Sequence, residues 1–231
     1  MIEMIRRFLR QKSRSVGTLS VLGLFAAASA FSIAASGGRG GLGSSGYLVL
    51  LVLAAASVSK DASTGALQMI LARPIRRTDY LFGRYLGILC AFAAFMAVCA
   101  VLGVLVKMAW KPDGPPLAPL AVLANLAYGT LWAAQIAAVL VFFSTFLPGY
   151  GDAIALVALE VLLSLQTNAA WVQRSVETVR RELLPVVAWE RVFDGDPAAL
   201  SGAGRAVLAS ALYLAAAAVI FARKEFAYGQ D

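Results

Sequence analysis

The sequence predicts an all-α protein that crosses a lipid bilayer about six times. Of its 231 residues, 60% are hydrophobic and only 14% are charged, whereas soluble domains usually carry about 25% charged residues. The mean hydropathy is +0.77. This apolar excess is too large for one soluble core. It is concentrated in long runs, and a helix needs roughly 20 mostly apolar residues to span a bilayer.

Six spans are expected, at residues 16–35, 47–59, 81–106, 117–147, 152–168 and 205–222. Pro112, Pro115 and Pro116 separate the third span from the fourth, because proline lacks the N–H group that would continue a helix. The residues from Leu147 to Gly151 predict a tight turn before the fifth span. Too little chain remains for a separate soluble domain, so a single transmembrane domain is expected over residues 1–231.

The distribution of basic residues predicts the orientation of the chain. Twelve of the 20 lysines and arginines lie in segments 1–15, 60–84, 147–151 and 223–231. Because lysine and arginine are enriched in cytoplasmic loops, these segments and both termini are expected to face the cytoplasm, at the inner membrane. The net charge of +7 arises from this clustering at the ends of apolar runs, so the lipid bilayer is the expected partner and nucleic acid is not.

The segment 169–204, on the opposite side, contains an amphipathic pattern. Charged residues alternate there with four apolar residues at helical spacing. The apolar residues are Val172, Val176, Val179 and Leu183. Such a helix suits the lipid–water interface. Two interpretations stay open, a lid over a substrate exit and a cap that fills space between spans.

Three polar residues inside the expected spans are candidates for a translocation path. Glu160 lies near the middle of the fifth span, where an ionisable group costs about 2.5–3.5 kcal/mol and usually faces protein or a cavity. Gln135 and Asn125 lie on the fourth span. The alternative for all three is a structural role, in which they form hydrogen bonds between helices.

The sequence contains no recognisable catalytic or metal-binding set. It has no histidine and no P-loop pattern G-x-x-x-x-G-K-[ST], so ATP hydrolysis by that route is not expected in this chain. Cys90 and Cys99 have no metal-ligand or disulfide spacing. We therefore expect no catalytic residue, no metal site and no cofactor in this chain.

The segment between the second and third spans carries the most information. A short cytoplasmic helix is expected at 62–72, with Ser63 or Thr64 as its cap and Pro74 after its end. Its apolar residues share one face: Leu67, Ile70 and Leu71. A helix of this kind can lie on lipid or insert into a groove of a cytoplasmic partner.

These residues resemble the membrane-spanning permeases of type-2 ATP-binding-cassette (ABC) exporters. That family's cytoplasmic pattern has an acid before Gly-Thr-Leu, further leucines, a proline, an arginine three residues later, and Gly-Lys at the start of the third helix. The positions that match are Gly65, Leu67, Met69, Ile70, Leu71, Pro74, Arg77, Gly83 and Arg84. The chain departs from the pattern with Ala66 for threonine, Arg84 for lysine, and Asp61 as the nearest upstream acid.

The resemblance implies that helix 62–72 is a coupling helix, which docks into a separate ATPase subunit. It assigns the coupling contacts to Gly65, Leu67, Ile70, Leu71, Pro74 and Arg77. It also implies two ATPase copies that bind ATP and Mg, and a second permease chain, expected to form a homodimer. The function implied is substrate export driven by ATP hydrolysis in the partner. Two alternatives from other classes remain, a secondary transporter that works without ATP and a non-transporting scaffold.

Overall fold

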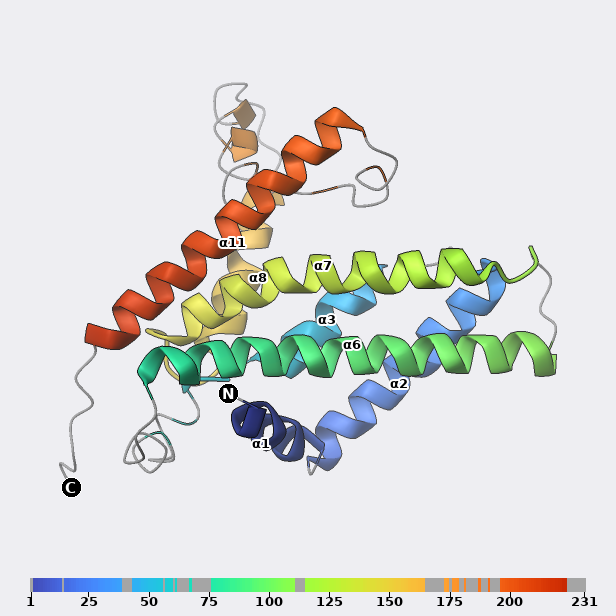
Figure 1. The fold of residues 1–231 in the computed structure, drawn as a ribbon, viewed down its shortest axis with the longest axis horizontal. Coiled ribbons are helices and arrows are strands. Elements are labelled where there is room, and N and C mark those ends of the chain that lie inside the picture. The colour runs from blue at the N-terminus through green and yellow to red at the C-terminus, as the bar shows by residue number, and fades with distance from the viewer. Residues whose placement is uncertain are drawn as a thin grey trace. The chain divides into compact units, whose positions relative to one another are not determined.

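The computed structural model describes residues 2–13, 15–38, 43–55, 57–59, 61, 67, 76–110, 115–164, 173–174, 176–178, 181, 187, 191 and 196–223. All regular secondary structure in these ranges is helical, which confirms the predicted all-α class. Figure 1 shows these helices along the chain. The chain divides into two compact units: unit 1 contains Ala55–Tyr85 and Ala138–Asp231, and unit 2 contains Ile2–Ala54 and Leu86–Ala137. The single domain over residues 1–231 stays a prediction.

Four helices are long and apolar enough to cross a membrane. They are α2 (Val16–Ala35), α6 (Arg77–Trp110), α7 (Pro119–Ser144) and α11 (Pro197–Arg223). They correspond to the first, third, fourth and sixth expected spans, so the chain is a multi-pass helical membrane protein. The α11 helix begins at Pro197 rather than at 205, because Asp196 caps it by accepting the N–H of Ala198 at 3.0 Å.

Two further helices are shorter than the bilayer core. The α3 helix (Gly43–Ala54) has 12 residues and α8 (Gly151–Ser164) has 14. At 1.5 Å per residue they extend about 18 and 21 Å, against a hydrocarbon core of about 30 Å. The second and fifth spans therefore stay predictions. Residues 165–168, which were expected to complete the fifth, lie outside the described ranges.

The N-terminal segment of unit 2 forms a helix that the sequence analysis did not predict, α1 (Ile2–Ser13). Phe8 is buried, and a Cβ placed on Gly87 would lie 3.0 Å from its ring. Lys12 Nζ donates to the carbonyl of Val52 at 3.0 Å, near the C-terminal end of α3, where a cation is favoured. Arg6 is exposed. This arrangement of apolar and basic residues is typical of a helix at the membrane interface.

Also in unit 2, the residues that follow α2 are bonded to the start of the fourth expected span. Gly37 and Gly38 follow α2 with φ of 68° and 92°, which favour glycine. The N–H of Ala118 donates to the carbonyl of Gly37 at 3.1 Å. In the same unit, Gly129 of α7 packs against Met96 of α6, where these two helices run side by side (Figure 1).

Unit 1 contains the predicted turn between α7 and α8. Gly149 has φ of 58°, and the N–H of Gly151 donates to the carbonyl of Pro148 at 3.0 Å, so the predicted turn is present. Within this unit α7 and α11 are linked by Phe142 and Tyr213, whose ring centroids lie 5.5 Å apart.

Candidate functional site

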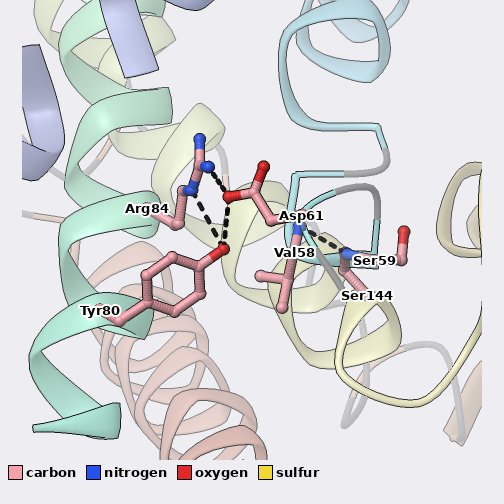
Figure 2. Close-up of polar contacts among 6 residues, drawn as sticks. All are labelled: Val58, Ser59, Asp61, Tyr80, Arg84 and Ser144. Carbon is pink, nitrogen blue, oxygen red and sulfur yellow. Dashed lines mark hydrogen bonds and ion pairs between the residues drawn. The ribbon is translucent and has the colours of Figure 1, made fainter. Parts of the chain in front are cut away.

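Three buried polar residues come together where α6 begins in unit 1. Asp61 is 4% exposed, Arg84 is 7% exposed, and Tyr80 is fully buried. Tyr80 and Arg84 are four residues apart on α6 and therefore share one face of the helix. Asp61 reaches them from the segment that follows α3, as Figure 2 shows.

Each of the three side chains contacts the other two. Arg84 forms an ion pair with Oδ2 of Asp61. The Tyr80 hydroxyl donates to the same oxygen at 2.7 Å, and Nε of Arg84 donates to the Tyr80 oxygen at 3.3 Å (Figure 2). A buried charge is costly unless it is paired and hydrogen-bonded. The triad meets this condition, because it contains one anion, one cation and a hydroxyl group that bridges them.

The segment before Asp61 is held by the end of α7. Oγ of Ser144, the last residue of that helix, accepts the N–H groups of Val58 at 3.1 Å and Ser59 at 3.2 Å (Figure 2). The hydroxyl of Ser59 donates to the carbonyl of Gly149 at 2.6 Å. These three hydrogen bonds attach residues 58–59 to the α7–α8 turn and leave Asp61 facing α6.

Arg77, at the other end of the predicted coupling segment, contacts the end of α11. Its guanidinium donates to the carbonyls of Phe221 at 3.5 Å and Ala222 at 3.0 Å. The last carbonyls of a helix lack intrahelical partners and carry partial negative charge, so an arginine is favoured there. The ring of Tyr80 also stacks on that of Phe221, with centroids 5.7 Å apart.

Of the predicted coupling residues, only Leu67 and Arg77 lie in the described ranges. Leu67 is helical and 1% exposed, so its side chain packs within this chain. The other predicted coupling residues lie outside the described residues: Gly65, Ile70, Leu71 and Pro74. Contact of this helix with an ATPase stays a prediction.

The predicted translocation residues belong to different units. Glu160 lies on α8 in unit 1 and is partly exposed, and within the described part of the chain it has no hydrogen-bond or ion-pair partner. Gln135 is buried and Asn125 is partly exposed, both on α7 in unit 2, and both interact with other groups. Their roles in transport stay predictions.

Sequence reasoning missed the contact between Asp61, Tyr80 and Arg84. Asp61 and Arg84 were named only as positions of the family pattern. The i, i+4 spacing of Tyr80 and Arg84 was readable, but nothing local indicates that Asp61 turns back onto α6. Ser144 gave no signal, because a serine at the end of an apolar run is common.

The triad is suited to holding a loop on a helix. Its carboxylate is engaged by Arg84 and Tyr80, and all three side chains are buried. Among the described residues, no group of three or more acidic, cysteine or histidine side chains is placed to hold a metal ion. The chain matches no protein-family model, no curated protein and no solved structure.

Proposed function

We propose that this chain is the permease subunit of an ABC exporter, which moves a substrate across the inner membrane using ATP hydrolysed by a separate ATPase subunit. The observation that carries the proposal is that the residues on either side of segment 62–76, Asp61 and Arg77, are both bonded to long helices. Asp61, which precedes the segment, is bonded to α6. Arg77, which follows it, is bonded to the end of α11. The resemblance of the same segment to the coupling region of type-2 ABC permeases supplies the partner.

Anchoring of this kind suits an element that transmits movement. A rigid-body transition needs stiff joints between the moving partner and the spans. A displacement of segment 62–76 would be delivered to α6 through the triad, and to α11 through Arg77. A loop joined to the spans by flexible chain alone would absorb the same displacement.

The contacts also support the proposed topology, in which both termini are cytoplasmic. In unit 1, Ser59 bonds to Gly149 and Arg77 bonds to Ala222, so segments proposed to be cytoplasmic or at the cytoplasmic ends of spans contact one another. In unit 2, Ala118 bonds to Gly37, which joins the loop after the first expected span to the start of the fourth, and both are proposed to lie on the outer side. Helices that cross the membrane in alternating directions require this segregation.

The burial of Leu67 refines the role of the coupling helix. A side chain that is 1% exposed is not available to a partner in this conformation. We propose that Leu67 holds the helix against its own chain, and that the ATPase contacts the remaining surface of segment 62–72. Two ATPase copies and a second permease chain complete the proposed transporter.

Co-purification tests the proposal directly. The tagged chain is purified from native membranes in mild detergent, and the complex is assayed for ATP hydrolysis and subunit ratio. An ATPase subunit present at one copy per permease chain is expected. If the chain alone in liposomes transports on an ion gradient, it is a secondary transporter. If it binds no ATPase and transports nothing, it is a scaffold.

The role of the anchors is tested on the same complex. Asp61→Asn should lower the amount of substrate transported per ATP hydrolysed, while the ATPase still co-purifies. Asp79→Asn is the matched control, because Asp79 lies in the first turn of α6 but is exposed. Equal coupling in the two variants would refute transmission through the triad.

A further inference from the structure

The end of α11 covers one side of the triad. The ring of Phe221 stacks on the ring of Tyr80, with planes 16° apart, and α11 runs beside Tyr80 in Figure 2. The guanidinium carbon of Arg84 lies 5.5 Å from the centre of the same Tyr80 ring. Phe221 is 1% exposed. It is therefore part of the apolar surroundings that keep water away from Tyr80 and from the ion pair that Tyr80 bridges.

The end of α11 is held in this place by two kinds of contact. Phe221 buries its ring against Tyr80, and the carbonyls of Phe221 and Ala222 accept hydrogen bonds from Arg77. Arg77 and Ala222 are exposed. Because a hydrogen bond that competes with water adds little net stability and burial of an aromatic ring adds more, the docking of Phe221 is the stronger of the two attachments.

The strength of the Asp61–Arg84 ion pair depends on this exclusion of water. An ion pair that is exposed to water contributes little to stability. In a buried pair, separation of the partners leaves an uncompensated charge away from water, which is costly. Docking of Phe221 therefore makes it harder to separate Asp61 from Arg84. Coupling of two equilibria is reciprocal, so separation of the ion pair must weaken the docking of Phe221 by the same factor.

We infer that Asp61, Tyr80, Arg84 and Phe221 form a two-state joint, in which docking of the end of α11 and attachment of Asp61 to α6 depend on each other. In the closed state the ion pair is shielded from water, and in the open state both attachments are weak. In the proposed transporter, a displacement of segment 62–76 that draws Asp61 off α6 would release the end of α11 as well. This consequence rests on the proposed function, whereas the joint is a property of the chain alone and is tested without an ATPase.

Thermal unfolding of the purified chain in detergent tests the coupling. Asp61→Asn should lower Tm by about 6–12 °C in the original chain, but by no more than about 4 °C in Phe221→Ala, where water reaches the ion pair. Phe92→Ala is the matched control, because Phe92 is also a fully buried phenylalanine but lies in unit 2, roughly two turns beyond Arg84 on α6. An undiminished effect of Asp61→Asn in Phe221→Ala would overturn the inference, and so would an equal reduction in both backgrounds.

Amide hydrogen exchange tests the same joint with a milder substitution. Phe221→Leu keeps an apolar side chain but removes the ring that covers Tyr80, so it opens the joint with a smaller loss of stability. Exchange of the N–H groups of Val58 and Ser59, which precede Asp61, should accelerate roughly tenfold. Phe92→Leu should leave it unchanged. Faster exchange at the end of α11 alone would show that α11 moves without loosening Asp61, which contradicts the joint.

The reverse experiment tests the reciprocity. Asp61→Asn should accelerate amide exchange at residues 219–223, at the end of α11, although Asp61 lies on the other side of the triad. Asp79→Asn, which changes an exposed carboxylate on the same helix as Tyr80, should leave exchange at the end of α11 unchanged. Equal exchange at residues 219–223 in the two variants would overturn the inference.

Discussion

Removal of the negative charge of Asp61 should destabilise the fold by about 3 kcal/mol. In Asp61→Asn the guanidinium of Arg84 keeps its place, 7% exposed, without its counter-charge. Breaking a buried ion pair by removing one partner costs about 3–5 kcal/mol. The lower end of this energy range applies here, because Nε of Arg84 still donates to the Tyr80 oxygen, at 3.3 Å. The side-chain carbonyl of the asparagine also still accepts a hydrogen bond.

The opposite change, Arg84→Met, should lower the free energy of unfolding at least as much. It leaves the buried carboxylate of Asp61 with the hydrogen bond from the Tyr80 hydroxyl but without a counter-charge. The double variant Asp61→Leu/Arg84→Met should recover only part of the loss, because the buried Tyr80 hydroxyl then lacks both of the partners that it has here. Replacing both members of a buried ion pair by apolar residues is often neutral or stabilising. A double-mutant cycle of Asp61→Leu, Arg84→Met and the double variant gives an interaction energy, which separates this coupling from two independent losses.

The assay is thermal unfolding in detergent, followed by circular dichroism. For chains of 150–250 residues each kcal/mol shifts Tm by roughly 2–4 °C, so Asp61→Asn should lower Tm by about 6–12 °C. Asp79→Asn changes an exposed residue, whose interaction with the helix dipole contributes at most about 1 kcal/mol. This substitution should therefore lower Tm by no more than about 4 °C. Equal shifts in these two variants, or additive losses in the double variant, would refute the reasoning.

Three further variants test other contacts. Ser144→Ala should cost about 1–3 kcal/mol, because it leaves two buried N–H groups without an acceptor, and amide hydrogen exchange at residues 58–59 should accelerate. Gly38→Ala should lower Tm, since φ is 92° and the new Cβ would lie 2.7 Å from Val122; the strain is about 1–2 kcal/mol. Glu160→Gln should lower transport if Glu160 faces the substrate path, and unchanged transport would return it to a structural role.

The long helices could be predicted because their sequences determine them locally. The first expected span, 16–35, agrees with α2 at both ends: the apolar run sets its length, and Ser15 caps its start by accepting the N–H of Thr18 at 3.4 Å. The turn at Gly149 was likewise readable from Pro-Gly chemistry.

Elements that depend on tertiary contacts could not be predicted in the same way. The spacing of Ile2, Ile5 and Phe8 is compatible with α1, but the basic residues among them by themselves predict only the orientation of the chain. The apolar run at 47–59 predicts one span, whereas α3 ends at Ala54. The N–H groups of residues 58–59 bond instead to Ser144, which is 85 or more residues away. Asp61 and Arg84 form their ion pair because the tertiary fold brings them together, and no local sequence pattern specifies that approach.

The contacts around Asp61 also imply an order of assembly during synthesis. Asp61 and Tyr80 are separated by 19 residues, so they can meet as soon as α6 has emerged. The hydrogen bond between Val58 and Ser144 joins residues 86 positions apart in the sequence, and that between Arg77 and Ala222 joins residues 145 positions apart. Because synthesis is directional and domains form N-terminal parts first, Arg84 can be neutralised before α7 exists. The nascent chain then offers the insertion machinery an already compensated charge, and α11 closes the structure last.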